Sequence, residues 1–212
     1  MSRGRFIAFE GGEGAGKSTH ARLLAESLRD RGLDVVLTRE PGGTPGAEAI
    51  RNLLLSTAGE GWDSRAEALL FAAARADHVE RLIEPALAAG KWVICDRFLD
   101  SSRAYQGGGG GLDDAEVLAL HRIGSGGLLP DATILIEASP EAVAARLARR
   151  DGDNADRIGG RDAAYHARVA LAFARFAVAE PDRFRRIDGN GSVAEVQERV
   201  LATVLPMLGA VP

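Results

Sequence analysis

The stretch FEGGEGAGKSTH, residues 9–20, decides the fold because its glycines and lysine have the spacing of a phosphate cradle. Gly11, Gly16, Lys17 and Ser18 match the P-loop pattern, in which glycines let successive backbone N–H groups converge on an anion. The following helix adds the positive end of its dipole, and the lysine adds a charge for the outer phosphates. A glycine-rich turn without a ligand is the alternative. The stretch therefore predicts a bound nucleoside triphosphate, with the Ser18 hydroxyl as a ligand for Mg²⁺.

The segments on both sides of this loop provide the context that a P-loop needs. A short apolar run at 5–9 predicts a strand before it, and apolar residues at helical spacing predict a helix over 18–32. The glycines of 106–111 predict a loop. Further strands are predicted at 34–38, 91–96, 132–139 and 184–188, and further helices at 46–56, 64–89, 113–123, 140–150, 162–179 and 192–208. This alternation predicts an α/β fold, a P-loop NTPase-type parallel sheet of about five strands flanked by helices on both faces.

Length and composition set further bounds. The chain has 212 residues, 46% of them apolar, which predicts one domain over residues 1–212. A net charge of −4 argues against binding a long nucleic-acid backbone. A single cysteine, Cys95, allows no intrachain disulfide, and no apolar stretch approaches membrane-spanning length. Without a secretory pattern, these features favour the cytoplasm, with no membrane partner.

The carboxylate that ends the predicted strand 91–96 and the arginine that follows it limit which reactions are possible. Asp96 closes the apolar run and, at a strand end beside the P-loop, suits the positioning of Mg²⁺; capping of the next turn is the alternative. Arg97 follows it where a hydrolase would carry an acid to polarise water, and no Asn-Lys-x-Asp guanine signature occurs. An arginine suits an anionic second substrate, so the sequence favours phosphoryl transfer between two phosphorylated molecules.

Six motifs in order along nearly the whole chain resemble the bacterial thymidylate kinase family. They are EGGEGAGKST (10–19), TREPGGT (38–44), FAAAR (71–75), DRF (96–98), SSRAYQGGGGG (101–111) and DRI (156–158). The resemblance implies a P-loop nucleoside-monophosphate kinase that phosphorylates dTMP to dTDP with ATP and Mg²⁺, in dTTP biosynthesis. It also implies a homodimer. The residues expected to bind ATP are Gly11, Gly12, Glu13, Gly14, Ala15, Gly16, Lys17, Ser18 and Thr19, and those expected to organise the metal are Ser18 and Asp96.

The same resemblance implies roles in acceptor binding. Glu13, an acid within an anion-binding loop, takes the position that accepts a hydrogen bond from the sugar hydroxyl of the acceptor. Arg51 and Arg97 match arginines that hold the monophosphate. Phe71 and Arg75 share a helical face, where the family stacks the ring on thymine and sets the arginine on the edge of the base. Surface arginines and a core phenylalanine are the alternatives. Further expected substrate contacts are Ser102, Tyr105 and Gln106.

An arginine-rich segment at 149–162 predicts a lid. Some family members place an arginine inside the P-loop where this chain has Gly14, so the positive charge for the transferring group must come from elsewhere. A solvated arginine cluster is the alternative. The lid arginines are Arg149, Arg150, Arg157 and Arg161, and the residues expected to act in catalysis are Lys17, Arg97, Arg149 and Arg157.

The chain departs from the family at two positions. Gly159 replaces the usual acid after DRI, and Phe98 replaces a commoner Tyr or His in DRF. Three rival functions stay open at this stage. They are a kinase for another monophosphate or for a deoxynucleoside, a nucleotide-gated switch or binding module, and a scaffold with a relic P-loop. The intact Lys17, Ser18 and Asp96 disfavour the last of these.

Overall fold

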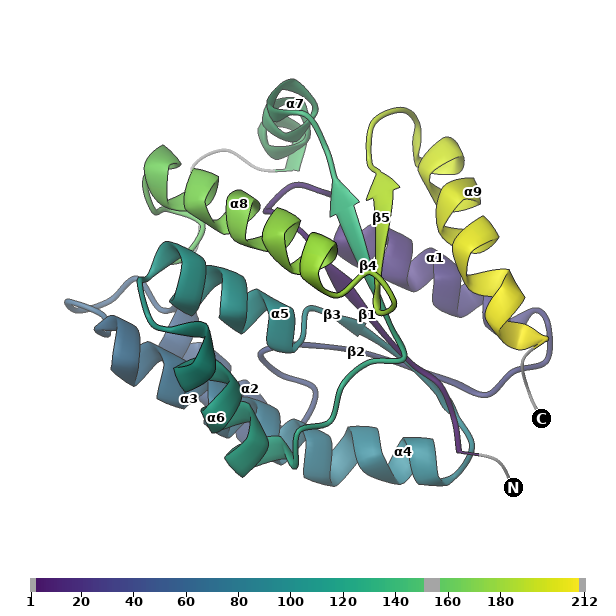
Figure 1. Cartoon of the computed structure of the whole chain (residues 1–212), viewed down its shortest axis with the longest axis horizontal. Helices are drawn as coiled ribbons and strands as arrows, with labels where there is room; N and C mark the ends of the chain where they lie inside the picture. The colour runs from purple at the N-terminus through teal and green to yellow at the C-terminus, as the bar shows by residue number, and fades with distance from the viewer. Residues whose placement is uncertain (1–2, 151–156, 210–212) are drawn as a thin grey trace.

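A five-stranded parallel sheet forms the centre of the computed structural model, which describes residues 3–150 and 157–209 and, at 149 and 150, the backbone alone (Figure 1). The strand order is β2-β3-β1-β4-β5, and the pairings between neighbours are all parallel. The predicted α/β sheet of about five strands is confirmed. The strands are β1 (Phe6–Glu10), β2 (Val35–Arg39), β3 (Trp92–Asp96), β4 (Ala132–Glu137) and β5 (Phe184–Asp188).

Helices cover both faces of this sheet, because the side chains of its central strand, β1, are apolar on both sides. Successive side chains of β1 alternate between two apolar cores: Ile7 and Phe9 pack in one, and Phe6 and Ala8 in the other. Figure 1 shows α1 and α9 side by side along one face. The helices are α1 (Lys17–Arg29), α2 (Pro45–Leu55), α3 (Ser64–His78), α4 (Glu84–Ala88), α5 (Leu99–Ser102), α6 (Asp114–Ser125), α7 (Pro140–Arg150), α8 (Ala163–Ala179) and α9 (Val193–Val204).

Local sequence signals set where several of these helices begin. Thr44 caps α2 by accepting a hydrogen bond from a backbone N–H of the first turn, and Pro45 follows at the first helical position. Asp63, Asp162 and Ser192 cap α3, α8 and α9 in the same way. These caps fix the ends of the helices that carry the side chains of the site described below.

Two predicted elements differ from the structure. The glycine run at 106–111 was expected as a loop, but a π-helical turn, η2 (Arg103–Gly109), continues α5 through most of it. Its glycines allow close contact with α8, since a Cβ added at Gly108 would lie 2.5 Å from the Cβ of Ala172. The single helix predicted over 64–89 contains a second π-helical turn, η1 (Val79–Ile83), between α3 and α4. A 3₁₀ turn, η3 (Leu205–Leu208), follows α9.

The carboxyl ends of the strands place the loops of interest at one edge of the sheet. Phe9 of β1 pairs with Asp96 of β3, so the phosphate loop and the Asp96–Arg97 turn emerge beside each other. Ligands of open α/β folds bind at this edge. Within residues 3–150 and 157–209, we find no helix with the length and apolar character needed to cross a membrane.

Candidate active site

The phosphate loop joins β1 to α1 in a conformation that requires its glycines. Gly11 and Gly16 have φ angles of 138° and 101°, and Gly16 is the left-handed residue that caps α1. A Cβ at Gly11 would lie 2.4 Å from the carbonyl oxygen of Ile136 in β4, so no larger residue fits there. The loop is therefore a strand–turn–helix anion cradle of the kind its sequence predicts.

Lys17 points back into the loop, where its Nζ donates a hydrogen bond of 2.6 Å to the carbonyl oxygen of Gly12. The side chain is buried, and burial together with the nearby Arg97 cation lowers the pKa of Lys17 to about 7 against the opposing effect of the neighbouring carboxylates. A phosphate group entering the loop would favour the charged ammonium. A polyphosphate bound in the loop would therefore favour uptake of a proton by this lysine.

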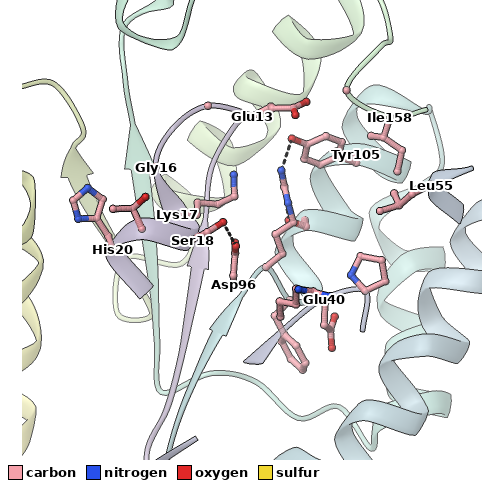
Figure 2. A pocket seen from close by; sticks show the side chains of 18 of the residues that line it. Glu13, Gly16, Lys17, Ser18, His20, Glu40, Leu55, Asp96, Tyr105 and Ile158 are labelled. Atoms are coloured by element: carbon pink, nitrogen blue, oxygen red, sulfur yellow. Dashed lines mark hydrogen bonds between the residues drawn. The ribbon is translucent and has the colours of Figure 1, made fainter. Parts of the chain in front are cut away.

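Ser18 and Asp96 lie together at the foot of the loop, and Figure 2 shows the hydrogen bond between them. The Ser18 hydroxyl donates to one carboxylate oxygen of Asp96. The other oxygen, Oδ1, is buried without a hydrogen-bond partner among the described residues. A hydroxyl beside a carboxylate oxygen with spare acceptor capacity suits Mg²⁺, which binds few protein oxygens and completes its shell with water and phosphate. The donor set therefore fits this ion.

Arg97 follows in a strained turn, and a buried acid that the sequence analysis did not single out holds that turn. Arg97 has φ of 67°, a left-handed conformation that costs a non-glycine residue about 1 kcal/mol or more. Glu10 accepts hydrogen bonds from the backbone N–H groups of Phe98 (2.8 Å) and Ser101 (3.0 Å). Burial, and then repulsion from Asp100, raises the pKa of Glu10 to about 7. Its position at the end of β1, directly before the loop, was the available signal.

One cavity of about 730 Å³ joins this loop to a second group of arginines. In Figure 2, Glu13 lies on the Tyr105 and Ile158 side of Lys17, whereas His20 lies on the opposite side. The cavity therefore has two halves around the loop. Of the predicted site residues, it is lined by Glu13, Gly14, Gly16, Lys17, Ser18, Thr19, Arg51, Phe71, Arg75, Asp96, Arg97, Ser102, Tyr105 and Gln106, whereas Gly11, Gly12 and Ala15 are not among the lining residues.

Three arginines of the second half are each held by a neighbour. Arg97 stacks on the Tyr105 ring at 5.0 Å from the centroid and donates to the Tyr105 hydroxyl at 3.3 Å, the bond drawn in Figure 2. Arg51 donates to the carbonyl oxygen of Pro41 at 2.7 Å. Arg75 donates to the Ser102 hydroxyl at 2.9 Å. This fixed positive charge facing the phosphate loop suits an anionic acceptor.

Gln106 is oriented by an acid and a lid arginine. Its amide Nε2 donates to Glu67 at 2.8 Å, which turns the amide nitrogen toward that buried acid. Arg161 binds the other oxygen of Glu67 at 2.5 Å and the Tyr165 hydroxyl at 2.6 Å. Arg161 is therefore engaged in supporting the wall of the cavity.

The other lid arginines lie apart from the cavity or outside the described side chains. Arg157 donates to three backbone carbonyls of residues 56–59, at 2.6, 2.8 and 3.1 Å, and does not line the cavity. The side chains of Arg149 and Arg150 lie outside the described residues, as do residues 151–156 of the predicted lid.

Arg146 is a cavity residue that the sequence analysis missed. Its guanidinium donates to the carbonyl oxygens of Ala15 at 3.0 Å and Gly189 at 2.6 Å. Val143 and Leu147 lie on the same face of α7, and a Cβ at Gly14 would be 3.1 and 3.2 Å from their side chains. The spacing of positions 143, 146 and 147 indicates one shared helix face and is the available signal, but the sequence does not show that this face covers the phosphate loop.

The two departures from the family motifs have physical explanations. A Cβ at Gly159 would lie 2.3 Å from Oε2 of Glu13, so an acid there would meet the Glu13 carboxylate. Phe98 is fully buried and packs edge-on against Phe6 and His121, with ring centroids 4.8 and 5.7 Å apart. The position of the missing hydroxyl or imidazole is thus filled by a ring in aromatic packing, and the Arg75 guanidinium lies over that ring at 5.2 Å from its centroid.

A strand–P-loop–helix unit with a carboxylate on the adjacent strand, facing a second set of fixed arginines, defines a P-loop phosphotransferase with two phosphorylated substrates. The family model of thymidylate kinase matches residues 9–200. The chain belongs to the thymidylate kinase family, and the reaction is the phosphorylation of dTMP to dTDP.

Similarity to known proteins extends over nearly the whole chain. A thymidylate kinase of Rhizorhabdus wittichii is 58% identical over 205 residues, covering 97% of this chain and 99% of that protein. One from Afipia carboxidovorans is 48% identical, covering 95% and 89%. The crystal structure of thymidylate kinase from Ehrlichia chaffeensis superposes with a TM-score of 0.77 at 35% identity, covering 96% of this chain and 99% of the other. The fold and the family are therefore shown independently.

Proposed function

We propose that the cavity binds the triphosphate of ATP in the phosphate loop and dTMP in the arginine-lined half, so that the γ-phosphoryl group passes directly between them. The observation that carries this proposal is the continuity of the cavity from Lys17 to Arg51 and Arg97. Two anions bound end to end satisfy the geometry of an in-line transfer. The acceptor is already an anionic oxygen, so no covalent enzyme intermediate and no strong general base is needed.

On the donor side, the loop amides and Lys17 hold the ATP phosphates. Ser18 and Asp96 would hold Mg²⁺, which neutralises charge on the phosphates when bound. Arg146 adds a fixed cation beside the loop, since its guanidinium is bonded to the carbonyl of Ala15. Its place on α7 between the loop and Gly189 makes it a donor-side residue in this proposal.

On the acceptor side, Arg97 and Arg51 align the monophosphate, and Phe71 stacks on the pyrimidine while Arg75 meets its edge. Glu13 takes the sugar hydroxyl, because Figure 2 places it on the Tyr105 side of the loop. In this proposal the anion-binding loop contains an acid because the carboxylate binds the sugar of the second substrate. The remaining proposed contacts are Ser102, Tyr105 and Gln106.

Catalysis in this proposal depends on Lys17 and Arg97 together with lid arginines Arg149 and Arg157. The proposed lid, residues 149–162, is a part of one kinase domain spanning residues 1–212. Arg157 is bonded to the carbonyls of residues 56–59, so a catalytic role requires it to leave them when the substrates bind. A closed lid would exclude water and limit ATP hydrolysis.

We also propose a homodimer in the cytoplasm, acting on small nucleotides without a nucleic-acid partner. Helices α3 and α6 pack together and expose Leu69 and Ile123 at 56% and 81% of their surface, which supports an interface there. The buried free thiol of Cys95 is compatible with a reducing compartment.

A coupled assay of ADP release tests the proposed function. ATP is combined with each of dTMP, dUMP, dCMP, AMP and thymidine, with and without Mg²⁺. We expect turnover with dTMP that requires Mg²⁺, and none with thymidine, which has no phosphate for Arg51 and Arg97. Equal turnover with thymidine would contradict the acceptor-phosphate assignment, and full activity in excess chelator would contradict the metal assignment.

A further inference from the structure

A buried chain of hydrogen bonds runs from the end of β2 to the acceptor half of the cavity, and no step described above uses it. Glu40, in the loop after β2, accepts a bond of 2.7 Å from Nε of Arg75. The same carboxylate is 3.0 Å from Nδ1 of His78, whose Nε2 is 2.8 Å from the Thr38 hydroxyl. The side chains of Arg75, Glu40 and His78 are exposed by only 3%, 4% and 0%.

The chemistry of these groups sets the direction of each bond. A carboxylate accepts only, so Nδ1 of His78 carries the hydrogen that Glu40 receives. Glu40 thus faces a guanidinium on one side and an imidazole N–H on the other, which fixes its rotamer. Removing the imidazole donor would leave a buried carboxylate oxygen without its partner, which is unfavourable unless the side chain moves. His78 therefore determines where Glu40 holds Arg75.

Among the described residues, the bonds of Arg75 occupy Nε and Nη2, which leaves Nη1 to donate to a ligand. Its Nε is bound to Glu40, and its Nη2 is bound to the carbonyl of Phe98 at 3.2 Å and to Ser102 at 2.9 Å. A guanidinium has donors and no acceptor. Held in this way at the cavity wall, the guanidinium can donate a hydrogen bond to a keto oxygen on the base edge. An exocyclic amino group at the same position would bring two donors together, which is unfavourable.

The loop that carries Glu40 also supports the other acceptor-binding arginine. Pro41, the next residue, accepts the bond from Arg51 through its carbonyl. Helix α3 fixes this loop at both ends, because His78 contacts Thr38 and the adjacent Asp77 accepts a bond from Thr44. The spacing between the base-edge arginine and the phosphate arginine is thus set by contacts of α3 with one loop.

We propose that His78 is a positioning residue for acceptor selectivity: through Glu40 it holds Arg75 where only a pyrimidine with a keto oxygen at that edge is accepted. The inference rests on the proposed role of Arg75 in dTMP binding. Loss of the His78–Glu40 bond lets Arg75 move, and dCMP, which carries an amino group at the same position, then competes better.

Three substitutions separate the two bonds of the imidazole. The amide nitrogen in His78→Asn can take the place of Nδ1 and keep the bond to Glu40. In His78→Gln the amide oxygen can take the place of Nε2, which keeps only the bond to Thr38. His78→Leu removes both. We expect the ratio of kcat/KM for dTMP over dCMP to fall roughly tenfold in His78→Gln and His78→Leu, a loss expected for a hydrogen bond to a charged group. His78→Asn restores most of the ratio, and KM for ATP stays within about twofold in all three.

Two further variants make each failure recognisable. Arg75→Lys tests the proposed role of Arg75 itself: if it keeps the wild-type ratio, that assignment fails and the inference fails with it. If Arg75→Lys loses the ratio while His78→Leu keeps it, only the inference about His78 is overturned. His121→Gln removes another buried histidine, one bonded to the carbonyl of Leu128. A loss of selectivity in this control as large as in His78→Leu would reduce His78 to a structural role.

Discussion

The phosphate loop and the arginine-lined half of the same cavity differ in what holds their binding groups in place. In the loop, the binding groups are backbone amides and Lys17, fixed by glycine dihedrals within residues 11–17. In the other half, the binding groups are long side chains from α2, α3 and the turn after β3, and each is held by a second residue. Substitutions should therefore act locally in the loop and through supporting residues in the arginine half.

The largest effect should come from Arg97→Ala, which removes a cation facing both anions. We expect kcat to fall by roughly 10³-fold, as for loss of a group that stabilises the transferring phosphoryl. The dissociation constant for ATP, measured by calorimetry, should change by less than about threefold, because the loop amides and Lys17 keep their positions and loss of the Arg97 cation only favours the charged form of Lys17. An equal loss of ATP affinity would remove the distinction between the two halves.

Arg146→Ala and Arg157→Ala form a matched pair that sharpens the comparison. Arg146 is bonded to the phosphate loop, so its loss should raise KM for ATP by roughly tenfold with little change in kcat. Arg157 is bonded away from the cavity and is proposed to reach the transferring group only when the lid closes, so its loss should lower kcat roughly tenfold while KM for dTMP stays nearly constant. Steady-state kinetics in both substrates separates these outcomes, and an unchanged kcat in Arg157→Ala would transfer the lid role to Arg149 or Arg150.

The pH dependence of ATP binding tests the loop half by itself. The pKa of Lys17 is lowered to about 7 in the free protein, mainly by burial, and bound phosphates would raise it. Above pH 7, ATP must therefore bind together with a proton, and its affinity should fall roughly fivefold between pH 7 and pH 8. Calorimetry in buffers of different ionisation enthalpy should show proton uptake at pH 8. Lys17→Arg, whose guanidinium stays charged, should bind without uptake; proton release by the parent protein would contradict this account.

The smallest expected effect is on KM for dTMP, in variants of Gly159 at the contact between the lid backbone and Glu13 of the phosphate loop. Gly159 lies against the Glu13 carboxylate, so an added Cβ would make the flexible end of Glu13 shift, and an added charge would repel it as well. We expect Gly159→Asp to raise KM for dTMP roughly threefold through like-charge repulsion, and Gly159→Ala to change it by less than about twofold. Equal effects of the two variants would show that volume, and not charge, matters at this position.

The two halves also differ in how far the sequence predicts them. The loop is local, so the spacing of Gly11, Gly16 and Lys17 predicted the phosphate cradle, and the apolar patterns at 5–9 and 18–32 predicted the strand and the helix beside it. The supporting residues Glu40 and His78 act over contacts 35 and 38 positions apart, for which local patterns carry no signal. Glu10 stands directly before the loop, but the sequence does not show that it bonds residues 88 and 91 positions away.

The glycine run at 106–111 is a region where the local sequence pattern gave a wrong prediction. Its composition predicts a loop, but close packing against α8 makes a π-helical turn of it, so a tertiary contact overrides the local preference. Arg146 was missed for a related reason, because the sequence does not show which face of α7 covers the phosphate loop.

A crystal structure with a non-hydrolysable ATP analogue and dTMP bound together tests the central claim most directly. The account predicts the analogue's phosphates in the loop, the dTMP phosphate between Arg51 and Arg97, and the pyrimidine against Phe71 with Arg75 at its edge. A pyrimidine bound away from Phe71 and Arg75, with Arg97 turned to solvent, would contradict it.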